Sequence, residues 1–415
     1  MSTGVILDIE TDALDATKIH CIVARDIKTN KVNEFVQQEC YTSFPKFAKT
    51  VDKFYMHNGL GFDQPIINRL TDADINWDKV VDTLILTQLL NPIIDKGNSL
   101  GSWGDRLGFP KDTPPKDFTN YTSDMLKYCN RDVDVTFKLV NYLSKQSHLL
   151  SKRSIKLEHK IRTIVTQQEK NGFALDEQKA MLLMNTFSDE AFKIEKELQD
   201  VFKPIITKRY HKTTNKPLKD NIENFNPGSR QQIAKRLVSL GWEPTKHTDK
   251  GSVIVSEEIL SKINLPEAKL ISKYLLLEKR VSQIKQWIKA VDNNGRVHGR
   301  VQTLSTVTGR MTHNTPNMAQ IPAVYSPYGK ECRECWTVSD PENYSLVGTD
   351  ASGLEVRALA HYMGDKDYIK EVIDGDVHTA NQKLAKEISD RIQLFRDKRS
   401  GKDVLVCPNL WGRSI

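Results

Sequence analysis

The sequence predicts an α/β domain at the N-terminus, then a mainly helical region, then the beginning of an α+β segment. The first prediction rests on short apolar strands that precede a helix over residues 124–143, at 4–9, 20–24 and 31–37. Residues 155–201 instead carry apolar side chains at helical spacing. An apolar run at 345–349 then ends in an acid and a glycine, after which helical spacing returns. We expect this run to be a buried strand that delivers Asp350 at its carboxyl end.

Length and charge narrow the class of protein. A chain of 415 residues predicts two to three domains, each with an ample core. Lys and Arg number 60 against 53 Asp and Glu, a net charge of +7. Residues 201–250 alone hold 11 basic and 4 acidic side chains, so 11 − 4 = +7. This basic segment suits a polyanion such as nucleic acid, although on charge alone a solvated loop is an equal alternative.

Cysteines and apolar runs exclude several classes. The six cysteines show no disulfide framework, and the Cys332 and Cys335 pair lacks the second pair that a zinc site requires. No apolar run reaches 18 residues, and the N-terminus lacks the charged and then apolar pattern of a signal peptide. We therefore expect a reduced, soluble, intracellular protein with no membrane segment.

Acidic residues recur at intervals in the N-terminal domain. Asp8 and Glu10 lie on the same face of the first strand, because side chains alternate with period two. Two carboxylates on one face repel each other unless a cation lies between them. Asp63 follows a glycine-rich turn at a helix start, and Tyr128 and Asp132 share one face of a later helix. Each alone has an ordinary structural interpretation, as a strand-end acid, an N-cap or a solvated helix residue.

Together these residues resemble a known set of motifs. The D-x-E of Asp8 and Glu10, the H-N-G-L-G-F-D run ending at Asp63, and the Y-x-x-x-D of Tyr128 and Asp132 resemble the DnaQ-like proofreading exonucleases. The resemblance implies an RNase H-like 3′–5′ exonuclease domain over residues 1–148, which hydrolyses DNA with two Mg²⁺ or Mn²⁺ ions. It implies that the four carboxylates hold the metals and that Tyr128 orients the attacking water.

The middle of the chain predicts long helices. One helix over 155–170 ends at Asn171-Gly172, and Asp176 caps the next, which runs to about Val201. The N-P-G-S-R-Q-Q run at 226–232 opens another helix, with Ser229 and Gln232 at the spacing of a capping box. A further helix is expected from Pro266 to about residue 291.

Several later motifs resemble family A (polymerase I type) DNA polymerases, in particular those of short-tailed, T-odd phages. They are N-P-x-S-x-x-Q at 226–232, T-G-R at 308–310, N-x-x-Q-I-P at 317–322, and the run at 345–357, which resembles motif A. The resemblance implies a thumb over 149–298 and a partial palm over 299–385, followed by a divergent tail over 386–415. Taken alone, residues 308–322 would be a polar surface loop.

The resemblance also implies roles for individual residues. Asp350 and the carbonyl of Ala351 would hold the polymerase metals, again two in that site, and Glu355 would exclude ribonucleotides by crowding the sugar. The binding site of the incoming nucleotide would be lined by Ser352, Gly353, Leu354, Glu355 and His378. Contacts to DNA would come from Thr308, Arg310, Asn317, Gln320, Arg230 and Lys235.

Two departures from the family pattern matter. Only 65 residues follow Asp350 (415 − 350 = 65), and they contain neither the fingers helix nor the H-D-E motif C that supplies the second palm carboxylate. Only about 23 residues separate Phe202 from Phe225, where the phage type has a long insertion that captures host thioredoxin. We therefore do not expect thioredoxin dependence.

We expect the N-terminal part of a phage replicative DNA polymerase, acting on DNA in the cytoplasm of the infected host, in which the exonuclease site alone is complete. A second chain carrying fingers and motif C is one explanation of the ending; an intron, a frameshift or a deliberate truncation are others. The alternatives are a stand-alone 3′–5′ exonuclease whose other half clamps DNA, and a non-catalytic DNA-binding remnant. The full acidic set favours a nuclease over a remnant, and the missing palm acid favours a nuclease over a polymerase for this chain alone.

Overall fold

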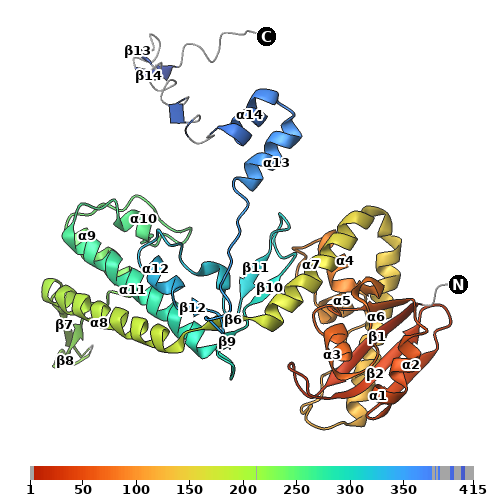
Figure 1. Cartoon of the computed structure of the whole chain (residues 1–415). Coiled ribbons are helices and arrows are strands. Elements are labelled where there is room, and N and C mark those ends of the chain that lie inside the picture. Colours follow the sequence, from red (N-terminus) through yellow and green to blue (C-terminus); the bar gives the residue numbers. More distant parts are fainter. Residues whose placement is uncertain are drawn as a thin grey trace. The chain divides into compact units, whose positions relative to one another are not determined.

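The computed structural model describes residues 4–211, 213–375, 379, 382–383, 393–396 and 403–406. Two compact units divide the chain, residues 1–345 and residues 346–415, and each is described by itself (Figure 1).

The first unit begins with a five-stranded sheet in the order β3-β2-β1-β4-β5. The strands are β1 (Gly4–Thr11), β2 (Ile19–Asp26), β3 (Val32–Val36), β4 (Lys53–Met56) and β5 (Val80–Asp82). The central strand β1 runs antiparallel to β2 and parallel to β4. The expected meander of three strands is therefore confirmed, and the sheet is extended on its other side by two parallel strands.

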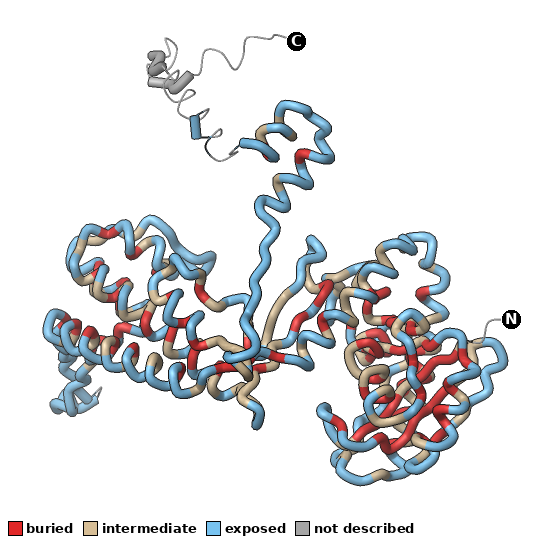
Figure 2. Tube along the Cα trace, viewed as in Figure 1, coloured by how far each residue is buried: buried red, intermediate tan, exposed pale blue. Residues whose placement is uncertain are grey.

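Helices cover both faces of this sheet, and Figure 2 shows the buried residues concentrated in the strands. The helices are α1 (Glu39–Thr42), α2 (Phe44–Ala48), α3 (Asp63–Leu70), α4 (Thr83–Leu90), α5 (Leu100–Arg106) and α6 (Ser123–Lys145). Val5, Leu7 and Ile9 pack in the cluster that includes α2 and α3. Ile6 packs instead with Cys129 and Val133 of α6, so even-numbered β1 residues face that helix.

Long helices follow, as expected from the sequence. They are α7 (Lys152–Asn171), α8 (Glu177–Val201) and α11 (Pro266–Lys289), and two shorter helices, α9 (Arg230–Ser239) and α10 (Glu257–Leu260), lie between the last two in the sequence. Gly172 ends α7 at φ +61°, a conformation that favours glycine, and the Asp176 side chain caps α8. Ser229 caps α9, but the Gln232 side chain accepts from Asn226 N–H at 2.7 Å rather than from Ser229. A shared apolar core holds α8, α9 and α11 together.

The basic segment forms an exposed hairpin of β7 (Ile205–Tyr210) and β8 (Pro217–Glu223). The hairpin begins after Phe202 and ends before Phe225, whose rings lie 4.6 Å apart between centroids. Both rings are buried in the helical core, while nearly all of the hairpin is exposed.

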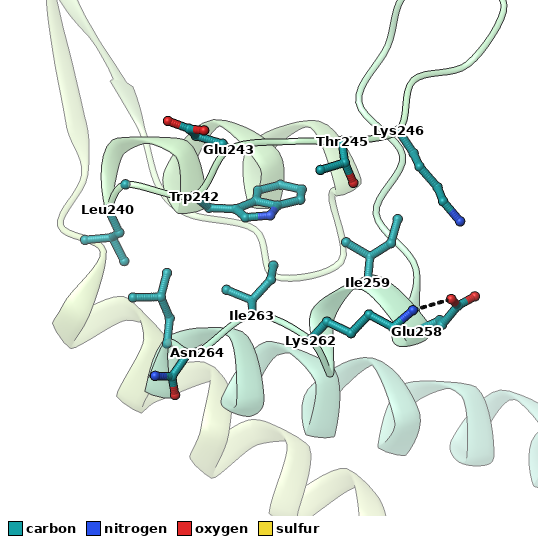
Figure 3. A pocket seen from close by; sticks show the side chains of 12 residues that line it. Leu240, Trp242, Glu243, Thr245, Lys246, Glu258, Ile259, Lys262, Ile263 and Asn264 are labelled. Atoms are coloured by element: carbon teal, nitrogen blue, oxygen red, sulfur yellow. Dashed lines mark hydrogen bonds and ion pairs between the residues drawn. The ribbon is translucent and has the colours of Figure 1, made fainter. Parts of the chain in front are cut away.

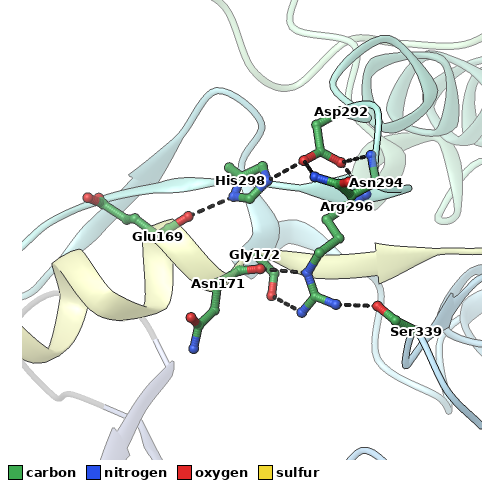
Figure 4. A network of polar contacts seen from close by, with 8 residues as sticks. All are labelled: Glu169, Asn171, Gly172, Asp292, Asn294, Arg296, His298 and Ser339. Atoms are coloured by element: carbon green, nitrogen blue, oxygen red, sulfur yellow. Dashed lines mark hydrogen bonds and ion pairs between the residues drawn. The ribbon is translucent and has the colours of Figure 1, made fainter. Parts of the chain in front are cut away.

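A polar network joins the end of α7 to a small sheet of β12 (Trp336–Thr337), β6 (Phe173–Leu175) and β9 (Arg296–Val297), as Figure 4 shows. The Arg296 guanidinium donates to the carbonyls of Asn171 at 2.6 Å and Gly172 at 3.1 Å, and to Ser339 Oγ at 2.5 Å. Asp292 accepts from Arg296 N–H at 2.8 Å, and such hydrogen bonds lower its pKa to about 2. The network fixes the chain entering residues 299–322.

That stretch contains a short hairpin of β10 (Arg300–Gln302) and β11 (Thr312–Asn314), followed by α12 (Gly329–Arg333).

The second unit corrects one expectation. Residues 345–350 form no strand; they are exposed coil, and Val347 is 85% exposed. A strand needs a neighbour to satisfy its backbone N–H and C=O groups, and none of the described strands pairs with this run. Helices α13 (Leu354–Met363) and α14 (Lys366–Asp374) follow, and β13 (Gln393–Arg396) pairs with β14 (Asp403–Val406).

Among the described residues, no helix combines the length and apolar character needed to cross a bilayer.

Candidate active site

An acidic cluster of four carboxylates, which repel one another electrostatically, lies beside the central strand β1; its members are Asp8, Glu10, Asp63 and Asp132. The period-two geometry of β1 turns Asp8 and Glu10 toward α6, which carries Asp132 on its buried face. Asp63 is the first residue of α3. Carboxylate oxygens of Asp8 and Glu10 lie with Cys129 Sγ in one group, all within 4.8 Å of one another.

The cluster raises the pKa of each of its members. Desolvation is the largest cause for all four, and neighbouring carboxylates add to it. The pKa of Glu10 rises to about 8 and that of Asp63 to about 7, while that of Asp8 lies well above its usual range. The charged forms are therefore costly here unless a cation lies among them.

A lysine outside the predicted set enters this cluster. Lys111, on the segment between α5 and α6, pairs its Nζ with Asp132 Oδ2. The same Nζ lies 4.8 Å from the centroid of the Tyr128 ring. Burial lowers the pKa of Lys111, but the interactions with Asp132 and Tyr128 together raise it above its ordinary value, so the ammonium stays charged.

The cluster suits divalent cations. Oxygen ligands are what Mg²⁺ and Mn²⁺ prefer, and the four side chains supply them from three different elements. Asp132 is 4% exposed, yet its Oδ1 has no hydrogen-bond partner. Such an orphaned buried oxygen costs free energy, which a metal ion bound there would recover.

The turn before Asp63 explains its glycines. A Cβ on Gly59 would lie 2.3 Å from Met56 Cβ, and one on Gly61 would lie 2.6 Å from Arg162 Nη2. The Asp82 side chain holds this turn by accepting from Asn58 N–H at 2.9 Å and Leu60 N–H at 3.0 Å, and it also caps α4. Asp82 thus has a structural role, which its place at the end of a strand favours.

Sequence reasoning missed Lys111 and Cys129. Lys111 lies in a proline-rich stretch without periodicity, so no spacing linked it to the acids. Cys129 is buried on α6 with Sγ 3.6 Å from Asp8 Oδ2; its position three residues before Asp132, on the same helical face, was an available signal.

The predicted polymerase residues occupy different surroundings. Asp350 is exposed, as are Ala351, Ser352, Gly353, Leu354 and Glu355. Gly353 begins α13 at φ +58°, and Arg357 Nε donates to the Ser352 carbonyl at 2.9 Å. No second carboxylate joins Asp350 in a metal-binding group within the part of the chain that the structure describes. His378 lies outside the described residues.

The predicted DNA contacts lie on the first unit. Thr308, Arg310, Gln320, Arg230 and Lys235 are exposed, while Asn317 is half-buried and caps a short 3-10 helix, Met318–Gln320. Arg230 already donates to the Val255 carbonyl at 2.9 Å.

A groove lies between the end of α9 and α10 (Figure 3). Trp242, Ile259 and Ile263 line it, with Lys246 at its rim and Lys262 paired to Glu258 at 2.7 Å. Its lysines are balanced by Glu243 and Glu258, so the groove itself has no excess of positive charge.

An acidic cluster on a central strand, followed by a basic helical region, is typical of enzymes that process nucleic acids. Residues 195–404, half of the chain, match the model of DNA polymerase family A. The match extends beyond residue 386, near which the resemblance was expected to end. The chain belongs to this family.

Two relatives are DNA-directed DNA polymerases of phages. That of Escherichia phage T7 is 28% identical over 93% of this chain and 73% of its own length. That of Enterobacteria phage T3 is 27% identical over the same shares. The fold is similar, at a TM-score of 0.69 and 16% identity, to the POL domain of Pol1 from M. smegmatis in complex with DNA primer-template and dNTP. That match covers 91% of this chain and 62% of the other.

Proposed function

We propose that this chain carries the 3′–5′ exonuclease of a phage DNA-directed DNA polymerase and removes nucleotides from DNA 3′ ends. The acidic cluster, with its orphaned Asp132 oxygen, is the observation that carries the proposal. Two Mg²⁺ or Mn²⁺ ions, when bound, would activate water and stabilise the leaving oxygen.

The chain's own residues have distinct parts in this reaction. Four carboxylates would hold the metal ions, whose positive charge would stabilise the scissile phosphate. These carboxylates belong to Asp8, Glu10, Asp63 and Asp132. Tyr128 keeps its hydroxyl protonated, because desolvation raises its pKa, and can hold the attacking water by a hydrogen bond. Water adds to phosphorus, the bond from phosphorus to the O3′ of the preceding nucleotide breaks, and that oxygen takes a proton. The products are a nucleoside 5′-monophosphate and a strand shortened by one nucleotide.

The rest of the chain would bind DNA. Lys208 and Arg209 are exposed on the hairpin, where basic side chains outnumber acidic ones. This excess of positive charge suits contacts to DNA phosphates. Lys212, which follows β7 in the sequence, lies outside the described residues. We propose no thioredoxin dependence, because a short hairpin connects Phe202 to Phe225, and we place the enzyme in the cytoplasm of the infected host.

The test is digestion of a 5′-labelled single-stranded oligonucleotide with Mg²⁺ or Mn²⁺. The parent should give a ladder shortened from the 3′ end, and a 3′-terminal phosphorothioate linkage should slow it. Asp8→Ala with Glu10→Ala should lose several orders of magnitude in rate, because both carboxylates hold metal. Asp124→Asn is the control, since Asp124 is exposed on α6 and forms its ion pair with Lys127, at 3.0 Å, on the same helix. Equal rates of degradation by the double variant and the parent would refute the proposal. A parent that degrades no DNA would leave the DNA-binding remnant as the better description.

A further inference from the structure

Lys111 brings one positive charge into the acidic cluster. Its side chain is 24% exposed, against 6% for the Asp132 side chain with which it pairs. Its Nζ also lies beside the Tyr128 ring, 4.8 Å from the centroid. A single ammonium therefore lies between the Asp132 carboxylate and the Tyr128 phenol. In the proposed exonuclease, that carboxylate would bind a metal ion and that phenol would hold the attacking water.

The main chain just before Lys111 is held by two hydrogen bonds. Arg131 Nε donates to the Pro110 carbonyl at 2.8 Å, and Phe109 N–H donates to the Gly104 carbonyl at 2.8 Å. The Arg131 guanidinium also covers the Phe109 ring at 3.5 Å. A change in the position of Nζ therefore requires only rotation of the long, flexible lysine side chain.

The ammonium and a divalent cation compete for the same carboxylate. Asp132 Oδ2 is taken by Lys111, and Asp132 Oδ1 has no partner. Like charges a few ångströms apart in a partly buried site repel each other far more strongly than in water, because the effective dielectric constant there is only about 20. Lys111 and a metal ion on Asp132 are therefore strongly antagonistic.

We propose that Lys111 is the counter-ion of the metal-free cluster and must leave Asp132 before a metal ion can bind there. The inference rests on the proposed exonuclease function and deepens it by naming what controls its metal loading. A metal then binds only to the fraction of molecules in which Lys111 is displaced, which weakens its apparent affinity by that fraction.

The test measures Mn²⁺ binding to the full chain by calorimetry and by the Mn²⁺ electron paramagnetic resonance signal, without DNA. Lys111→Met should bind Mn²⁺ about tenfold or more tightly than the parent, because every molecule is then competent. Its melting temperature in EDTA should be lower than the parent's, and Mn²⁺ should raise it further than it raises the parent's. Lys111→Arg keeps the charge and should bind like the parent.

Lys127→Met is the matched control, because Lys127 lies on α6 but is 74% exposed. It should change neither affinity nor melting temperature. Equal or weaker Mn²⁺ binding by folded Lys111→Met would overturn the inference; if that variant does not fold, Lys111→Gln replaces it with the same expectations. Tighter Mn²⁺ binding without any DNA degradation would support the inference while refuting the proposed function. Failure of both parent and variant to bind Mn²⁺ would refute both.

Discussion

The backbone N–H of Asp82 donates to Nε2 of His159 at 2.8 Å, joining β5 to α7 across 77 residues of sequence. His159 Nδ1 in turn donates to the Ile155 carbonyl at 2.8 Å, which fixes the neutral tautomer. Since Asp82 also holds the turn that precedes Asp63, α7 is connected to the acidic cluster through one buried histidine.

His159→Leu should lower the free energy of unfolding by about 1–3 kcal/mol, because the buried Asp82 N–H loses its acceptor. Urea denaturation followed by circular dichroism measures this. His148→Leu should have little effect, since His148 is exposed, and His159→Gln should recover part of the loss by offering an amide oxygen. Equal losses at positions 148 and 159 would contradict the structural role of the bond.

The metal-free protein should become more stable as the pH falls from about 8.5 to about 6.5. Glu10 and Asp63 have folded-state pKa values of about 8 and about 7, above their unfolded values. A raised carboxyl pKa stabilises the fold at low pH, and this contribution is lost as the pH rises through 7 and 8. The urea midpoint in EDTA at both pH values measures it.

Saturating Mg²⁺ should flatten that pH dependence, because the bound cation favours the charged carboxylates. Asp8→Asn with Glu10→Gln should flatten it without metal. A midpoint in EDTA that does not change between the two pH values would argue against the raised pKa values.

Lys208→Ala with Arg209→Ala should weaken duplex binding of every sequence alike. Each lost phosphate contact should reduce the slope of log affinity against log salt by about one. Fluorescence anisotropy at several salt concentrations checks this. Lys46→Ala with Lys49→Ala is the control. Both lysines are exposed on or next to α2, and replacing them removes the same charge as the hairpin variant does. A hairpin variant that loses only one class of sequence would contradict non-specific phosphate contact.

Alone, the chain should not extend primers. Phosphoryl transfer depends on electrostatic groups placed around the transferring phosphate, each worth about 3–4 kcal/mol, and Asp350 lies in exposed coil without a second described carboxylate. The assay is primer extension by the Asp8→Ala variant, with and without a chain that carries fingers and motif C. Extension by the single chain would refute the prediction; extension after addition would indicate that the second chain completes the site.

Local patterns predicted much of this fold because their causes are local. Period-two alternation placed Asp8 and Glu10 on one face, and Asp176 and Ser229 marked helix starts by capping. The strand expected before Asp350 was wrong, since an apolar run specifies a strand only where a neighbour pairs with it. Lys111 could not be predicted from the sequence either. Its approach to Asp132 depends on the packing of Phe109 against Arg131, and no local spacing in the sequence indicates that contact.

The rings of Phe202 and Phe225, tilted at 52° to each other, act as a clasp at the base of the hairpin. Because the clasp belongs to the helical core and the residues beyond it are exposed, the core does not depend on what the clasp encloses. Closing a longer loop at the same clasp would cost little more, about 0.6 kcal/mol for each doubling of its length. The helical region that carries the hairpin therefore has a built-in exchange point, at which segments of very different size can be gained, lost or grafted while the helices keep their packing.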